Sequence, residues 1–103
     1  MTLPPRDHRI SLATAAELTR RFREQAAPDA VKAGALHADQ VRALLAQPGV
    51  VALRVYYGLD AEGNSTLVLV GMDANDQELT DGVLLDIIWP CPPFCTEASP
   101  LNS

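Results

Sequence analysis

The chain has 103 residues, of which 48% are hydrophobic and 20% are charged, and its net charge is −5. This composition is that of a folded globular protein rather than of a disordered or collagen-like one, and the length predicts a single domain. The acidic balance argues against a nucleic-acid partner, and the apolar runs fall short of the roughly 18 residues that a membrane helix needs.

The N-terminal segment, residues 1–9, is polar and proline-rich, so it predicts a flexible arm outside the core. It lacks the apolar stretch of a secretion signal, and we therefore expect a cytoplasmic protein. A helix is predicted to begin after Ser11, whose hydroxyl can cap it, and to end before Pro28. Its apolar residues recur at spacings of three and four: Leu12, Ala15, Leu18, Phe22 and Ala26.

Residues 29–37 have no clear preference, because Gly34 weakens the prediction of a helix there. A second helix is predicted over residues 38–47, and a Pro-Gly pair directly after it ends it. Its buried side is predicted to consist of Val41, Leu44 and Leu45.

The second half of the chain predicts strands. Residues 50–57 and 66–72 are rich in β-branched and aromatic side chains, and the turn formers between them predict an antiparallel hairpin. Residues 83–89 fit a third strand or a short helix, and their length and isoleucine content favour the strand. The prolines that follow, at positions 90, 92 and 93, predict no regular structure beyond it.

Together these elements predict an α+β fold, with two N-terminal helices packed on a small antiparallel β-sheet and a Pro/Cys-rich C-terminal tail. We expect one domain over residues 10–95 and a flexible tail over residues 96–103. The second predicted strand is apolar on both faces. Since two short helices cover only one face, the other needs either the segment around Trp89 and Phe94 or another molecule, and we expect a homodimer through the sheet.

The most chemically specific segment is Trp-Pro-Cys-Pro-Pro-Phe-Cys at residues 89–95. Cys91 and Cys95 have the spacing of half a zinc site, whose other half would come from His8 and His37 or from the cysteines of a second copy. They could instead form a disulfide or respond to redox state, although three intervening residues, two of them proline, exclude a thioredoxin-type pair. A third alternative is that both thiols stay reduced in a tail that its aromatic residues pin onto the core.

Two other patterns resemble ligand loops incompletely. Residues 58–65 nearly match a phosphate-binding loop, but Asn64 stands in place of the lysine and a strand follows in place of a helix. Residues 73–81 are acidic, but Glu78 and Leu84 stand where a calcium loop needs glycine and glutamate. We therefore interpret both segments as turns.

Charge is distributed unevenly along the chain. Residues 1–47 carry seven basic and five acidic residues, whereas residues 48–103 carry eight acidic residues and one basic residue, Arg54. This asymmetry permits docking between copies or on a basic partner, and it also arises when each half only has a solvated face. Arg54 interrupts an apolar strand, so we expect it to pair with a neighbouring carboxylate.

Four segments carry a resemblance: the helix end at residues 19–23, the strands at 53–58 and 67–73, and Cys-Pro-Pro-Phe-Cys at 91–95. With them the chain resembles a group of small bacterial proteins of unknown function that end in a Cys-Pro-Pro-x-Cys tail. The resemblance covers most of the chain. It implies one compact α+β domain to which the tail belongs, and it brings no assigned activity, cofactor or catalytic residue.

The sequence contains no arrangement of residues that signals a catalytic site, so we expect no enzymatic activity. It predicts a non-catalytic protein-interaction or assembly module, homodimeric or bound to another protein, without a cofactor. The alternative is a metal-binding or redox-responsive protein that acts through Cys91 and Cys95, with zinc as the metal.

Overall fold

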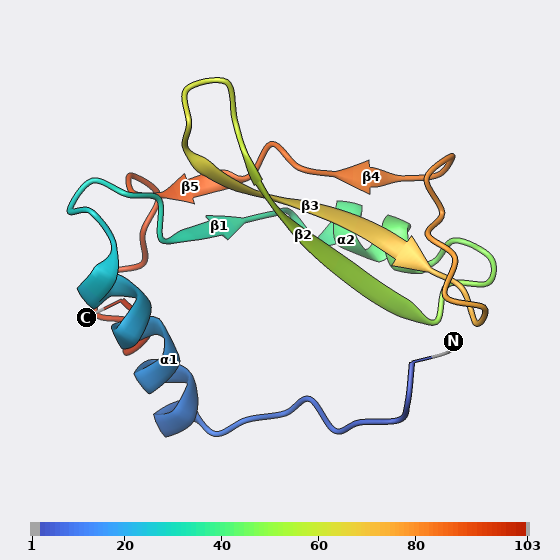
Figure 1. The fold of residues 1–103 in the computed structure, drawn as a ribbon, viewed down its shortest axis with the longest axis horizontal. Helices are drawn as coiled ribbons and strands as arrows, with labels where there is room; N and C mark the ends of the chain where they lie inside the picture. Colours follow the sequence, from blue (N-terminus) through green and yellow to red (C-terminus); the bar gives the residue numbers. More distant parts are fainter. Residues whose placement is uncertain (1–2, 103) are drawn as a thin grey trace.

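The structure is a computed structural model that describes residues 3–102, which form two helices and two small antiparallel sheets (Figure 1). The elements in chain order are α1 (Leu12–Gln25), β1 (Ala33–Ala35), α2 (Ala38–Leu45), β2 (Ala52–Leu59), β3 (Ser65–Met72), β4 (Leu84–Leu85) and β5 (Trp89–Cys91). The predicted α+β class is confirmed. Neither helix within this range has the length and apolar character that are needed to cross a membrane.

Helix α1 begins where its cap predicts. The Ser11 hydroxyl accepts a hydrogen bond from the Thr14 N–H at 3.1 Å, which satisfies one of the backbone donors that the first turn leaves unpaired. On the outer surface of the helix, Arg20 forms ion pairs with Glu17 and Glu24. All residues of α1 are described, and none of them is buried.

The larger sheet has the strand order β2-β3-β4. β2 and β3 form the predicted antiparallel hairpin, in register from Ala52 opposite Met72 to Leu59 opposite Ser65. α2 covers β3 and β4 by inserting Leu44, which is fully buried, against Leu69 and Leu85. Among the described residues, the buried hydrophobic side chains are Leu44, Leu69, Val70, Met72, Leu85 and Cys91.

The side chain of Gln47 links the end of α2 to the start of β4. Its Nε2 donates to the Leu44 carbonyl at 2.8 Å, and its Oε1 accepts from the Val83 N–H at 2.9 Å. A Cβ at Gly82 would lie 2.1 Å from the same Oε1, so a side chain at this position would displace the Gln47 amide. The amide therefore fixes where the third strand enters the sheet.

The smaller sheet was not predicted in this form. β1 pairs antiparallel with β5, with Ala33 opposite Cys91 and Ala35 opposite Trp89. Its sequence, Ala-Gly-Ala, lacks the β-branched and aromatic residues that identify strands. Gly34 is nevertheless required there, because a Cβ would lie 2.4 Å from Cδ1 of Ile88.

The single strand predicted over residues 83–89 is wrong, because this segment contains β4, a break and the first residue of β5. The break is at Ile87, whose φ of 47° lies outside the extended region. The expectation of no regular structure from Pro90 onward is also wrong, since Pro90 lies within β5. A two-stranded sheet has only edge strands, where proline is tolerated, and the Pro90 carbonyl accepts from the Phe94 N–H at 2.9 Å.

We predict that Leu44→Ala lowers the free energy of unfolding by about 2–5 kcal/mol, because it leaves a cavity at the contact of α2 with the sheet. Leu45→Ala on the same helix is the matched control, since this side chain is 45% exposed and its truncation should cost much less. Urea unfolding followed by circular dichroism measures both. Equal losses for the two variants would contradict this location of the core.

Candidate interaction site

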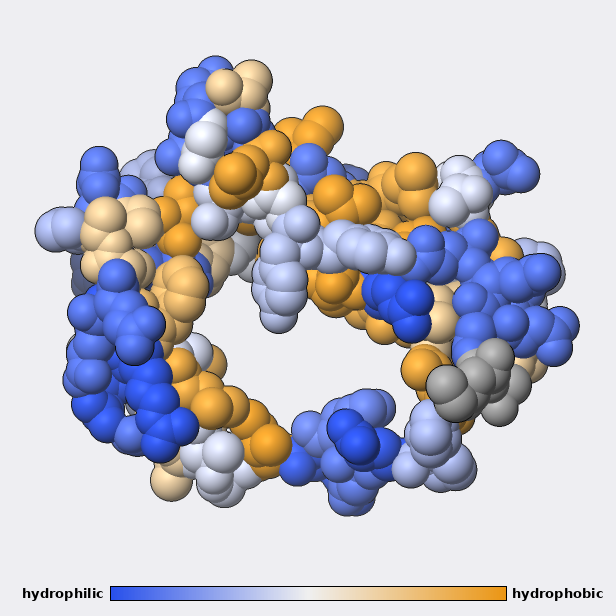
Figure 2. Space-filling model, viewed as in Figure 1, coloured by the Kyte–Doolittle hydropathy of each residue, from blue (hydrophilic) through white to orange (hydrophobic). Residues whose placement is uncertain are grey.

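The apolar stripe of α1 faces an opening rather than a core. Figure 2 shows apolar side chains of α1 turned toward an open space that the sheet bounds on the other side. Leu12, Leu18 and Phe22, which carry the predicted stripe, are each at least half exposed. The helical periodicity is therefore present, but much of the stripe remains in contact with solvent.

Strand β2 exposes a matching apolar row across the opening. Val55 lies opposite Leu69 in the register, so the odd-numbered residues of β2 share the sheet face on which α2 packs. Their exposure shows that α2 does not extend over this strand. We call these four side chains the β2 row: Leu53 (38% exposed), Val55 (43%), Tyr57 (92%) and Leu59 (73%).

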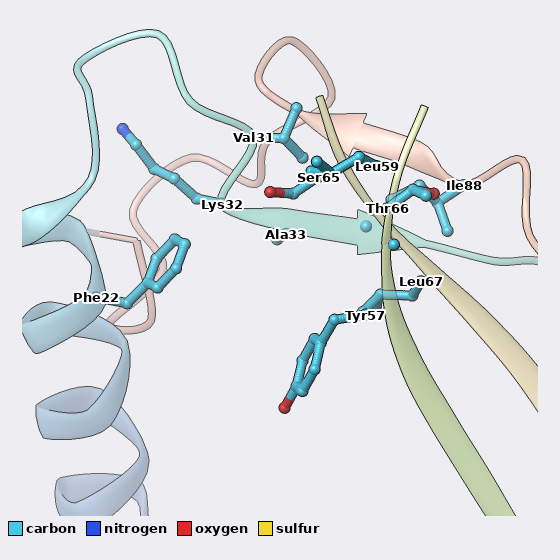
Figure 3. Close-up of a pocket in the computed structure, with 12 residues that line it drawn as sticks. Phe22, Val31, Lys32, Ala33, Tyr57, Leu59, Ser65, Thr66, Leu67 and Ile88 are labelled. Carbon is cyan, nitrogen blue, oxygen red and sulfur yellow. The ribbon is translucent and has the colours of Figure 1, made fainter. Parts of the chain in front are cut away.

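A cavity of about 380 Å³ joins the β2 row to α1. Phe22 contributes from α1, Tyr57 from β2, and Ile88 from the segment before β5, and Figure 3 shows Phe22 and Tyr57 on opposite sides of the space. The lining is mostly apolar, and Lys32 is the one charged residue among the described residues that form it. The cavity is thus the narrow end of the opening, where helix and sheet approach each other.

The C-terminal segment also lies beside α1. A second cavity, of about 430 Å³, is lined by Leu18 and Phe22 together with Trp89 and Phe94. The rings of Trp89 and Phe94 are in edge-to-face contact, with centroids 5.0 Å apart. These aromatic residues therefore face α1 and do not close the open face of the larger sheet, as the sequence had suggested.

Arg23 connects α1 to the predicted C-terminal tail, residues 96–103, of which 96–102 are described. Its Nη1 donates to the Leu101 carbonyl at 2.5 Å. Leu101 also lines the second cavity, beside α1. The tail thus contacts α1 through Arg23 and beside the second cavity.

Cys91 and Cys95 are joined by a disulfide, with their Cα atoms 4.8 Å apart. Cys91 is buried at the end of β5, whereas Cys95 is exposed in the turn that follows. In this state neither sulfur is the thiolate that zinc requires. Within residues 3–102 no three or more histidine, cysteine, aspartate or glutamate side chains gather as a metal site, so His8 and His37 do not join the cysteines.

Arg54 lies on the opposite face of the sheet from the β2 row. Its Nη1 is 3.2 Å from Oε2 of Glu78, which confirms the expected carboxylate partner, and the Tyr56 hydroxyl donates to the same carboxylate. Hydrogen bonding with Tyr56, and then with Glu78, raises the pKa of Arg54. This ion pair therefore lies on the face opposite the apolar row.

The two loops that resemble ligand sites are closed by their own aspartates. Oδ1 of Asp60 accepts from the N–H groups of Glu62 and Asn64, both at 2.9 Å. Asp73 accepts in the same way from the second and fourth residues after it. The Asp60 carboxylate thus occupies backbone donors that a phosphate would need, and the Asp73 carboxylate accepts from the backbone of its own loop. Both contacts agree with the interpretation of these segments as turns. The hydrogen bond from the Asn64 N–H makes the largest contribution to lowering the pKa of Asp60.

Comparison with family models, with curated proteins and with solved structures found no match to this chain. The candidate site therefore rests on its own geometry. The sequence predicted the apolar stripe of α1 that contains Phe22, but it did not identify the exposed face of β2, because periodicity shows that a face is apolar and not which surface covers it. The sequence did contain one signal of an uncovered surface: two short predicted helices cannot cover both apolar faces of the sheet.

We predict that the Asp60 carboxylate stabilises the hairpin in a pH-dependent way. Because its pKa is lower in the folded chain than its ordinary value of 3.8, its contribution is complete above 3.8 and is lost as the pH falls through the folded value. Asp60→Ala should therefore destabilise the protein at neutral pH, and the difference from the parent should narrow below 3.8.

Urea unfolding at neutral pH and at a series of lower values measures this difference. Glu62→Ala is the control at neutral pH, since among the described residues Glu62 contributes its backbone N–H and not its carboxylate to the hydrogen bonds of this turn. A difference between parent and Asp60→Ala that does not change with pH would contradict the role of the charge.

Proposed function

We propose that this chain is a non-catalytic protein-interaction or assembly module and that its partner is a second copy of itself. The observation that carries the proposal is the amount of surface left exposed. The chain exposes 7852 Å², whereas a compact monomer of 11.1 kDa is expected to expose about 5,700 Å². Its radius of gyration is 15.3 Å, against about 13 Å for a compact domain of this length.

The excess surface has the size and character of a subunit interface. It amounts to about 2,200 Å² per chain, in the range that stable homodimers bury on each subunit. Part of it belongs to the extended arm, but α1 and β2 contribute large apolar side chains that face one opening. Exposed patches of this extent in soluble proteins mark interaction sites.

The net charge of −5 favours a protein partner over nucleic acid. We place the module in the cytoplasm, as its N-terminal composition predicts, and group it with the small bacterial proteins that end in a Cys-Pro-Pro-x-Cys tail. We assign it no cofactor and no reaction.

Light scattering after size exclusion tests the dimer. At tens of micromolar protein we expect a mass twice the 11.1 kDa of the chain, because the exposed apolar surface is covered only on association. A mass of one chain at this concentration would contradict the homodimer. Serial dilution then gives the dissociation constant from the loss of the larger species.

A second candidate function is the metal- or redox-responsive one, and the observation that favours it is the position of the disulfide. It joins β5 to the turn that carries Phe94, beside α1. In a reducing cytoplasm the bond is subject to reduction, which would release this turn and expose two thiols that can bind zinc. The redox state of Cys91 and Cys95 would then control the position of the turn that lies beside α1.

For this candidate we predict that dithiothreitol yields two titratable thiols and lowers the melting temperature. Removing a disulfide of this kind lowers stability because the unfolded chain is no longer constrained, by about 2 kcal/mol for so short a loop. The Cys91→Ser/Cys95→Ser double variant, which has neither bond nor thiols, is the control. Elemental analysis of protein purified without chelator measures zinc, and protein that is free of metal and unchanged by dithiothreitol would contradict the candidate.

A further inference from the structure

Strand β2 is an edge strand without the features that usually prevent edge-to-edge pairing. It has eight residues and is in continuous register with β3. It contains no proline, and its one charge, on Arg54, is paired with Glu78 on the face opposite the β2 row. Natural edge strands are usually short, bulged, proline-containing or charged. Among the described strands none pairs with the outer edge of β2.

The hydrogen bond from the Asp60 N–H to the Asn64 carbonyl, at 2.9 Å, shows which residues of β2 direct their backbone groups toward β3. Because hydrogen-bonding direction alternates along an antiparallel pair, the even residues of β2 point their backbone groups at β3. The residues of the β2 row therefore point their N–H and C=O groups outward. One edge thus combines free backbone groups with exposed apolar side chains.

We propose that β2 pairs antiparallel with β2 of a second copy, around a twofold axis at Tyr56, so that the two three-stranded sheets become one sheet of six strands. This rests on the proposed function and adds the surface and the register. Only odd residues are free to pair, so the registers that use most of the strand are centred on Val55 or on Tyr56. The register centred on Tyr56 pairs the outward backbone N–H and C=O groups of all four residues of the β2 row.

The side chains fit this register. Val55 lies opposite Tyr57 of the second copy, and Leu53 lies opposite Leu59 of the second copy, so each β2 row continues into the other. Pairs of an aromatic with a β-branched residue are among the favourable cross-strand pairs. On the other face, Tyr56 meets Tyr56 of the second copy across the axis.

The charge distribution favours a second copy at this edge. β2 contains none of the eight acidic residues of the C-terminal half, so pairing brings no carboxylates opposite each other. In the proposed register, Arg54 lies opposite Gly58 of the second copy and away from its own equivalent. An interface made by symmetry also uses the same patch twice, which a self-complementary strand allows.

The second copy's strand would occupy the opening beside β2. Phe22 of α1 and Tyr57 of β2 line one cavity, so α1 lies on the sheet face of the β2 row (Figure 3). A strand added to β2 extends this row beneath the apolar side of α1, which faces the opening in Figure 2. The helix then covers a surface that spans both copies.

Cross-linking tests the register. The Cβ atoms of a non-hydrogen-bonded pair lie about 4.5–5.5 Å apart, close enough for a disulfide after small adjustment. Tyr56→Cys should therefore form a covalent dimer under mild oxidation, seen on a non-reducing gel. Ala61→Cys, exposed at the hairpin turn and far from the axis, is the matched control and should stay uncross-linked.

A second variant tests the surface independently of cysteine chemistry. Tyr57→Lys should raise the dimer dissociation constant at least tenfold, because it buries a charge beside the apolar row, while the monomer should fold because this position is 92% exposed. Ala61→Lys adds the same charge at the turn and should leave the constant unchanged.

The outcomes separate the two proposals. A dimer by light scattering that neither cross-links through Tyr56→Cys nor weakens with Tyr57→Lys would overturn the β2 pairing and leave the proposed homodimer standing. A monomer at tens of micromolar would overturn both, and the free edge would then belong to a strand of another protein.

Discussion

The packing of Leu44 against Leu69 and Leu85 holds α2 on the larger sheet. This contact determines which part of the sheet is buried. α2 has eight residues, which is about 12 Å of helix. That length covers β3 and β4 and leaves β2 uncovered. The apolar sides of β2 and α1 are therefore a consequence of one short helix serving a three-stranded sheet.

α1 has a different set of neighbours, at the C-terminal end of the chain. The disulfide and the Trp89–Phe94 pair shape the turn after β5, and Arg23 binds the Leu101 carbonyl. This arrangement keeps α1 beside the smaller sheet and turns its apolar side toward the opening. The cysteines and the exposed surface, which looked like competing sites in the sequence, thus belong to one structural unit.

The proposed function follows from this division of roles. The hairpin carries Arg54 and Tyr56, which interact with Glu78, on one face and its apolar row on the other. Its turn is closed by Asp60. A surface of this kind can associate without a change of the underlying fold, because the strand that would pair is already extended and its outward backbone groups already point away from β3.

The sequence by itself determined the elements whose signals are local. The Ser11 cap, the end of α1 before Pro28 and the β2–β3 hairpin depend on neighbouring residues, so periodicity and turn chemistry were sufficient to predict them. Only the tertiary structure decided the position of β1, the split of residues 83–89 and the cover of each apolar face. These depend on partners far apart in the chain, such as Gly34 and Ile88, and the pairing of distant segments leaves no pattern within either one.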